Sequence, residues 1–249
     1  MPYDFIPAAY LTQDFAIAAA AILVAGLIRG FSGFGSAMIL SPVLSLLWGP
    51  TVGVPVAIIV EVAPTLQLTP PALRIAHWRT VWSLGIPALL LIPAGSWLLV
   101  SLPAETMRRS IALLVLALVG VLWSGWRYRG PRGPGMSAIV GALGGFLSGS
   151  TGIGGPPTIL YLMSGGDGPA LVRANLICFF SLMFVGLVGF FAWSGLITTD
   201  ILWRAGLLIP VFVIGIVVGS RLFGLASEAT FRNIAFGCLA ATSAWVLLA

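Results

Sequence analysis

Lysine is absent from this chain of 249 residues, and charged residues of all kinds make up only 8% of it. Soluble globular domains carry charge on about a quarter of their residues, so this composition excludes a soluble globule. Hydrophobic residues make up 59% of the sequence, and its mean hydropathy is +1.09. The sequence therefore predicts an all-α membrane protein that crosses the bilayer several times.

Residue types that serve in catalysis are equally scarce. The chain has one histidine, no paired carboxylates, no Gly-x-Ser-x-Gly sequence and no histidine or cysteine spacing typical of a metal site. A phosphate-binding loop that ends in Gly-Lys is impossible without lysine. The two cysteines, Cys178 and Cys238, lie in apolar runs, which is typical of small core residues. We therefore expect no enzyme activity, no cofactor and no bound metal.

The positive charges are all arginines, and the net charge is +5. Aromatic residues are not interleaved with them in the way that base stacking requires, so we expect no nucleic-acid partner. So few charges in so apolar a chain indicate instead the orientation of the protein in the membrane.

Six apolar runs are long enough to cross the hydrocarbon core of a bilayer, which is about 30 Å thick and takes about 20 helical residues. Each is predicted to be a membrane-spanning helix. They lie at about 51–69, 81–101, 109–126, 170–193, 203–222 and 231–248.

Two glycine-rich segments, Gly30–Ser36 and Gly149–Gly155, interrupt the remaining apolar sequence. The stretches that flank them are Phe15–Ile28 with Ala37–Trp48, and 136–147 with 156–164. A helical arm of twelve residues reaches only about 18 Å, roughly half way across a bilayer. We therefore predict two re-entrant helical hairpins whose tips are the glycine-rich segments, because irregular backbone at membrane depth has to be buried in protein or line a cavity.

The sequence also repeats internally. Gly30, Gly33 and Gly35 match Gly149, Gly152 and Gly154 at an offset of 119 residues. Later pairs are Trp78-Arg79 with Trp203-Arg204, Gly95-Ser96 with Gly219-Ser220, and Glu105, Arg109 and Ile111 with Glu228, Arg232 and Ile234. The chain is thus predicted to be one transmembrane transporter domain, 1–249, made of two homologous halves, 1–130 and 136–249.

The arginines favour an inverted arrangement of these halves. Three crossings in each half would invert the second half relative to the first, with eight arginines in the cytoplasm and three outside when the amino terminus is outside. The cytoplasmic ones would be Arg74, Arg79, Arg127, Arg129, Arg132, Arg173, Arg221 and Arg232, and the outer ones Arg108, Arg109 and Arg204. Eight crossings with parallel halves would leave six inside and five outside, which the positive-inside rule disfavours.

The hairpin tips are candidates for an anion-binding site. The second arm of each hairpin would begin with unpaired N–H groups and the positive end of its dipole near the midplane, and such helix ends bind anions. The candidate residues are Ser32, Gly33, Gly35 and Ser36 in the first tip, and Ser148, Ser150, Thr151, Gly152 and Gly154 in the second. The alternative is that the glycines only allow close helix packing.

Three further residues are candidates for roles in this site. Arg29 directly precedes the first tip, and its guanidinium would attract an anionic substrate, stabilise carbonyl groups of the hairpin or pair with Glu61. Glu61 is the one acid within a predicted span, where an ionised carboxylate is costly. It is a candidate proton carrier, the partner of Arg29, or a residue at a cavity or helix end with no specific role. Asn175 would bind substrate or hydrogen-bond a neighbouring helix.

At its glycine-rich segments the chain resembles the TauE/SafE family of sulfite and sulfonate permeases, also called the toluene sulfonate uptake permease family. The segments are Gly30-Phe31-Ser32-Gly33-Phe34-Gly35-Ser36 and Gly145-Phe146-Leu147-Ser148-Gly149-Ser150-Thr151-Gly152-Ile153-Gly154-Gly155-Pro156. The resemblance implies a carrier in the bacterial cytoplasmic membrane for small sulfur-containing or carboxylate anions such as sulfite, sulfoacetate or isethionate. It leaves the direction open, because members of the family are assigned to both export and uptake.

We therefore expect a secondary transporter that moves such an anion by alternating access around a midplane site. Coupling to a proton is left open, and so are two alternatives from other classes: a passive anion channel and a non-transporting membrane scaffold subunit. The expected partners are the small anion and membrane lipids, and a homodimer is left open.

Overall fold

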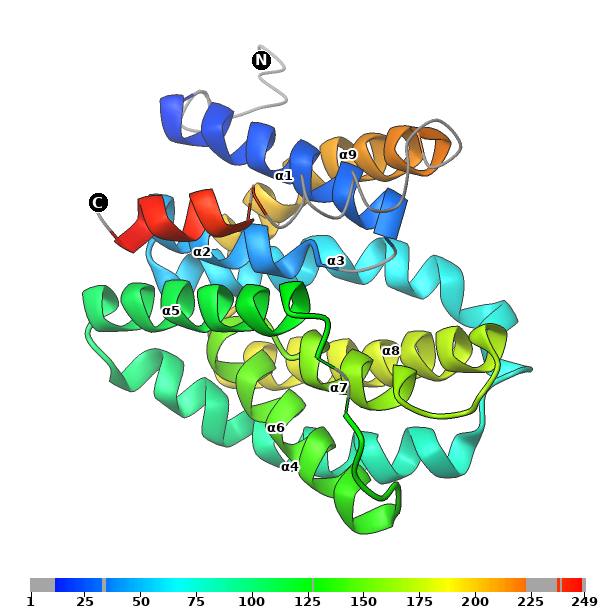
Figure 1. Ribbon diagram of the computed structural model, residues 1–249. Coiled ribbons are helices and arrows are strands. Elements are labelled where there is room, and N and C mark those ends of the chain that lie inside the picture. The colour runs from blue at the N-terminus through cyan, green and yellow to red at the C-terminus, as the bar shows by residue number, and fades with distance from the viewer. Residues whose placement is uncertain (1–11, 33–34, 127, 223–236, 238, 248–249) are drawn as a thin grey trace.

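The computed structural model describes residues 12–32, 35–126, 128–222, 237 and 239–247, and these residues form helices and turns without a strand (Figure 1). The helices are α1 (Gln13–Ser32), α2 (Ala37–Trp48), α3 (Pro50–Leu73), α4 (Trp78–Ser101), α5 (Ala104–Trp123), α6 (Pro134–Thr151), α7 (Gly155–Met163), α8 (Pro169–Trp193) and α9 (Thr199–Leu222). Residues 239–247 are helical as well. Within this part of the chain six helices are long and apolar enough to cross a membrane. The prediction of an all-α polytopic membrane protein is confirmed.

Five of the six predicted spans correspond to α3, α4, α5, α8 and α9. The sixth, 231–248, lies largely outside the described residues. Helix α1 takes its place among the six, because Gln13–Gly30 is long enough to cross, whereas the sequence predicted a shorter arm. Whether α1 and α2 enter and leave on one face of the membrane stays a prediction.

Both predicted breaks interrupt the helices, but they are shorter than predicted. Helix α1 continues to Ser32 and α6 to Thr151, so Gly30 and Gly149 lie inside helices. The chain then turns at Gly35, with φ of +94°, and at Gly152, with φ of +74°. Residues with a side chain rarely adopt this left-handed backbone conformation, which is why glycine is needed at these two positions.

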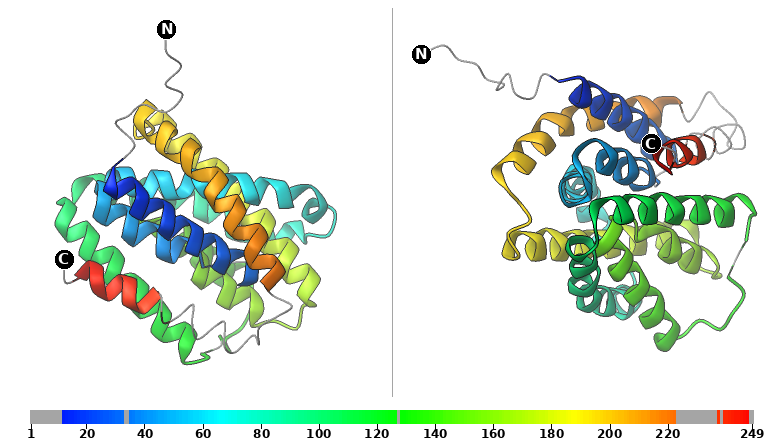
Figure 2. Two further views of the ribbon diagram at one scale, coloured as in Figure 1. Left: turned by 90° about the horizontal axis from the view of Figure 1, so that it is seen from above. Right: turned by 90° about the vertical axis from the view of Figure 1, so that its left-hand side faces the viewer.

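The helical glycines instead bring α1 and α6 against helices from the other half of the chain. Helix α1 packs along α9, and α6 packs along α4 (Figures 1 and 2). A Cβ atom added at Gly26 would lie 2.6 Å from the carbonyl oxygen of Phe212, and one added at Gly149 would lie 2.5 Å from that of Ile92. For these glycines the structure supports the alternative role, close helix packing.

The two helix pairs use matching positions of the repeat. Gly30 faces the Ile216 carbonyl oxygen as Gly149 faces that of Ile92, with offsets of 119 between the glycines and 124 between the isoleucines. The same offsets relate Gly26 and Phe212 to Gly145 and Ala88. The repeated sequence therefore makes repeated contacts between the two halves. Inversion of the halves relative to a membrane stays a prediction.

Figure 1 also separates the connections that contain the arginines. The connection from α3 to α4, with Arg74, and the one from α5 to α6, with Arg129 and Arg132, lie on its right-hand side. The turn from α4 to α5 lies on the left-hand side and leads directly to Arg108 and Arg109. Any topology in which α4 and α5 each cross the membrane once requires this separation, so it fits the inverted and the parallel arrangement equally.

Helices α3 and α8 contact each other and connect the two halves at the centre. Of the six candidate spans, α3 has the largest buried share, 56% of its most apolar window. Its Glu61 is 4% exposed. A carboxylate buried in this way needs a partner. Glu61 also lines a cavity beside α3.

Candidate functional site

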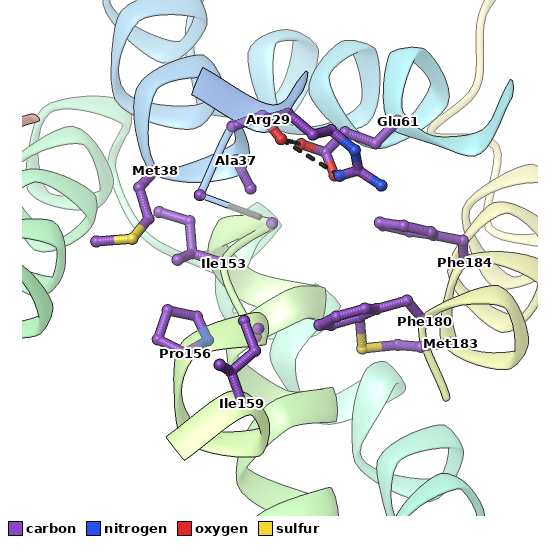
Figure 3. A pocket seen from close by; sticks show the side chains of 15 residues that line it. Arg29, Ala37, Met38, Glu61, Ile153, Pro156, Ile159, Phe180, Met183 and Phe184 are labelled. Atoms are coloured by element: carbon purple, nitrogen blue, oxygen red, sulfur yellow. Dashed lines mark hydrogen bonds and ion pairs between the residues drawn. The ribbon is translucent and has the colours of Figure 1, made fainter. Parts of the chain in front are cut away.

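A cavity of about 50 Å³ lies where the two chain breaks meet α3 and α8 (Figure 3). The first break contributes Gly35, Ser36 and the beginning of α2, and the second contributes Gly152 to Gly155. The full lining consists of Arg29, Gly35, Ser36, Ala37, Met38, Glu61, Gly152, Ile153, Gly154, Gly155, Pro156, Ile159, Phe180, Met183 and Phe184. Segments 119 residues apart in the sequence thus face one small space.

Arg29 is the cationic residue of this cavity, and it is paired with Glu61. Its Nη1 lies 2.5 Å from Glu61 Oε2 and donates to Ser36 Oγ at 3.3 Å, while Nη2 donates to Thr65 Oγ1 at 2.7 Å. The hydroxyl of Ser36 donates in turn to Glu61 Oε1. The side chains of Arg29 and Glu61 are only 14% and 5% exposed. One hydrogen-bonded network therefore joins α1, the first break and α3.

As an ion pair, Arg29 and Glu61 together carry no net charge. A buried ion pair gains stability only when further hydrogen bonds satisfy both charges, and here the hydroxyls of Ser36 and Thr65 provide them. Of the alternatives for Arg29, the structure shows the pair with Glu61, while the attraction of an anionic substrate stays a prediction. A guanidinium offers several donors in a planar fork, so it can bind a second oxyanion from the cavity side.

The two breaks differ in the backbone donors that they offer. Helix α2 begins with a tight turn in which the Met38 amide donates to the Gly35 carbonyl oxygen at 3.1 Å. The first amides of a helix have no partner within it, which leaves those of Ser36 and Ala37 beside the cavity. Helix α7 begins Gly155-Pro156-Pro157, and proline has no amide hydrogen. The corresponding amides beside the cavity in the second break are those of Gly154 and Gly155, so the breaks differ in the residues that supply the amides and not in their number.

Three predicted hydroxyl residues do not line the cavity. Ser148 Oγ lies 3.1 Å from the sulfur of Met183, Ser150 Oγ donates to the Phe146 carbonyl oxygen at 2.9 Å, and Thr151 Oγ1 donates to that of Leu147 at 2.7 Å. Ser150 and Thr151 lie in the last turn of α6, where a hydroxyl readily bonds to the carbonyl four residues earlier. They complete the end of a helix, which reduces the predicted set for the second break to Gly152 and Gly154.

Asn175 also lies away from the cavity. Its Oδ1 accepts a hydrogen bond of 2.7 Å from the amide of His77, in the turn between α3 and α4. It is 2% exposed and belongs to the first turns of α8. The structure thus agrees with the alternative role, a hydrogen bond to a neighbouring segment. The side chain of Ser32 and the whole of Gly33 lie outside the described residues.

Sequence reasoning missed the apolar wall that α8 contributes. Phe180, Met183 and Phe184 line the cavity, and the rings of Phe180 and Phe184 stack at a centroid distance of 6.3 Å (Figure 3). Helix α8 is apolar on all sides, so its pattern does not show which face meets the cavity. In the part of the chain that the structure describes, no three histidine, cysteine or acidic residues gather as a metal site would require.

Comparisons with known proteins show which family the chain belongs to. Residues 18–246 match the family described as sulfite exporter TauE/SafE. A protein of Cupriavidus necator described as "Probable sulfite/organosulfonate exporter TauE" is 31% identical over 236 residues, which cover 87% of this chain and 90% of that protein. No solved structure matches the chain. The chain therefore belongs to the sulfite exporter TauE/SafE family, and it is a multi-pass transporter of the bacterial inner membrane rather than an enzyme.

Proposed function

We propose that this transporter exports a small sulfur-containing anion, sulfite or a short organosulfonate, and that the cavity at Arg29 is its binding site. The observation that supports this most directly is the position of Arg29 in a cavity between the two chain breaks. Short carboxylates share the charge and the planar oxygen pair that a guanidinium recognises. The outward direction and the preference for sulfur compounds follow from the name of the Cupriavidus necator relative.

The size of the cavity agrees best with sulfite. A cavity of about 50 Å³ has room for roughly three to five water-sized groups, since one water needs about 10–15 Å³ by this measure. Sulfite consists of one sulfur and three oxygen atoms. Larger sulfonates need additional space.

Glu61 gives the site a way to bind a proton together with the anion. The bound anion and the Glu61 carboxylate compete for the same guanidinium, because both are negative and both accept from Arg29. Protonation of Glu61 removes that competition. We propose that one proton binds to Glu61 for each anion bound, and that the Arg29–Glu61 pair reforms when both leave.

Such coupling is compatible with export. The inside-negative membrane potential contributes about 2.3 kcal/mol per elementary charge and 100 mV. A sulfite dianion that leaves with one proton still moves one negative charge outward, so the potential still favours its exit. A sulfonate monoanion with one proton moves no net charge, and its own concentration gradient has to supply the driving force.

The helix packing suggests which parts move in alternating access. Helix α1 is locked to α9, and α6 to α4, by contacts that leave no room for a side chain. Movement of one helix pair against the other is therefore easier than movement of the two helices within a pair. We propose that α1 and α2 move with α9, that α6 and α7 move with α4, and that the cavity opens between the two groups.

Counterflow in proteoliposomes tests the proposed function. Vesicles loaded with unlabelled sulfite should take up labelled sulfite several times faster than empty vesicles if the protein is a carrier. A passive channel would show no such acceleration, and a scaffold would show no flux and no thermal stabilisation by sulfite.

The role of Arg29 needs a variant that still folds. Arg29→Gln leaves Glu61 unpaired, so the matched double variant Arg29→Gln with Glu61→Gln removes both charges and keeps hydrogen-bonding groups. The double variant should be stably expressed and should lose sulfite transport. Wild-type transport by the stable double variant would remove Arg29 from the site.

A further inference from the structure

The strongest unassigned feature is an apolar groove next to the cavity at Arg29. It has a volume of about 300 Å³ and lies between α3 and α8. Its walls include Val62 and Leu66 from α3 and Val185 and Val188 from α8. Leu66 is 45% exposed and Val185 is 61% exposed, so the groove is open at the protein surface.

Two residues connect this groove with the anion-binding cavity. Phe184 lines both spaces and is only 7% exposed, so its ring is the partition between them. Thr65 lines the groove and accepts a hydrogen bond of 2.7 Å from Arg29 Nη2. The guanidinium of Arg29 therefore lies at the junction of the cavity and the apolar groove.

We infer that the groove binds the hydrocarbon tail of an organosulfonate whose head group is held at Arg29, and that Phe184 determines how large a tail is accepted. This inference rests on the proposed function, since it assigns a tail to a head group bound at Arg29. A sulfonate with an alkyl or aryl tail combines the two chemistries found here, an oxyanion for the guanidinium and an apolar chain for the groove. The cavity alone has room for sulfite, and rotation of the Phe184 ring would join it to the groove.

Gly189 makes the groove accessible to a selective test. It lines the groove and not the cavity, and a Cβ atom at this position would have no neighbour within 4 Å. The Cβ of Gly189→Leu would meet no neighbouring atom, and the leucine side chain would occupy part of the groove. Gly206 of α9 has equally open surroundings at another place on the surface, so Gly206→Leu is the matched control.

The experiment measures inhibition of labelled sulfite transport in proteoliposomes by methane-, butane- and hexanesulfonate. Each methylene that enters the groove should strengthen inhibition by about fourfold, which corresponds to about 0.8 kcal/mol of apolar burial. Wild type and Gly206→Leu should both show this dependence on chain length. Hexane- and methanesulfonate should inhibit the Gly189→Leu variant nearly equally. The Phe184→Ala variant should bind the longer sulfonates more tightly than the wild type does, relative to methanesulfonate.

Several results would overturn the inference. In the first, the wild type transports sulfite but its inhibition by sulfonates does not depend on tail length. In the second, inhibition depends on tail length to the same extent in Gly189→Leu as in Gly206→Leu. The second result would mean that tails partition into the bilayer or that a lipid chain occupies the groove. A wild type that transports neither sulfite nor methanesulfonate would instead contradict the proposed function, so the two failures are distinguishable.

Discussion

The guanidinium of Arg29 and the carboxylate of Glu61 lie 2.5 Å apart in the wall of the cavity, and each also bonds to a hydroxyl, Arg29 to Thr65 and Glu61 to Ser36. The pair holds the first chain break against α3, and the guanidinium of Arg29 lines the cavity. We propose that it also binds the anion there. Variants of the pair should separate these functions.

Removal of one partner should cost more stability than removal of both. Arg29→Gln or Glu61→Gln alone leaves a buried charge without its partner, and such changes cost about 3–5 kcal/mol. In the double variant the two neutral side chains retain hydrogen bonds, so much of this loss should be recovered. Thermal unfolding in detergent measures the three variants. If the double variant lost as much stability as the two single variants added together, Arg29 and Glu61 would not be energetically coupled.

Glu61→Gln should also change how transport responds to pH. If Glu61 carries the proton, an imposed pH gradient should accelerate sulfite transport by the wild type and leave the Glu61→Gln variant unaffected. Because glutamine cannot ionise, it also ceases to compete for Arg29, and sulfite should bind more tightly. Flux with and without a pH gradient, in vesicles of equal protein content, provides the measurement. An unchanged response to the gradient would exclude Glu61 as the coupling group.

Glycines that separate the paired helices should be intolerant of any side chain. Gly30→Ala and Gly149→Ala each place a methyl group against a backbone carbonyl of the opposite half, at Ile216 and Ile92. Overpacking of this kind costs about 1–3 kcal/mol. Because the two contacts are equivalent in the repeat, their losses of thermal stability should be similar. Gly206→Ala, with open space around it, is the control and should be neutral.

Asn175 should contribute to stability and not to substrate affinity. Asn175→Ala removes the acceptor of the His77 amide, at a cost of about 1 kcal/mol. The KM for sulfite should stay within twofold of the wild type. Asn175→Asp keeps the acceptor oxygen and should be less destabilised. A tenfold rise in KM with unchanged thermal stability would return Asn175 to the substrate site.

Much of the fold could be predicted because hydrophobic length and glycine spacing are strong signals in membranes. Helix α2 occupies Ala37–Trp48 as predicted, since Gly35 and Gly49 end the apolar run on either side. The extent of α1 and α6 was underestimated. Glycine marks both a break and a close helix contact, and the sequence does not distinguish Gly30, which packs against α9, from Gly35, which turns the chain.

The site was predictable where charge was involved and unpredictable where it was not. Arg29 and Glu61 were conspicuous because charges in apolar runs are costly. Phe184 was not, because it is one apolar residue among many in α8 and only the three-dimensional packing selects its face. Ser150 and Thr151 were predicted to bind the anion, but their hydroxyls bond to carbonyl groups of their own helix. The sequence does not show which of these two partners a hydroxyl near a break will have.

The partnership of α1 with α9 and of α6 with α4 has a consequence for how the chain assembles. If the polypeptide were cut between α5 and α6, each fragment would contain two helices whose glycine faces pack against the other fragment, α1 and α4 in the first and α6 and α9 in the second. The fragments should therefore be degraded when made separately and recover function when made in the same cell. By the same geometry, an ancestral protein with a single repeat would have had to function as a homodimer in which the helices of each copy packed against those of the other.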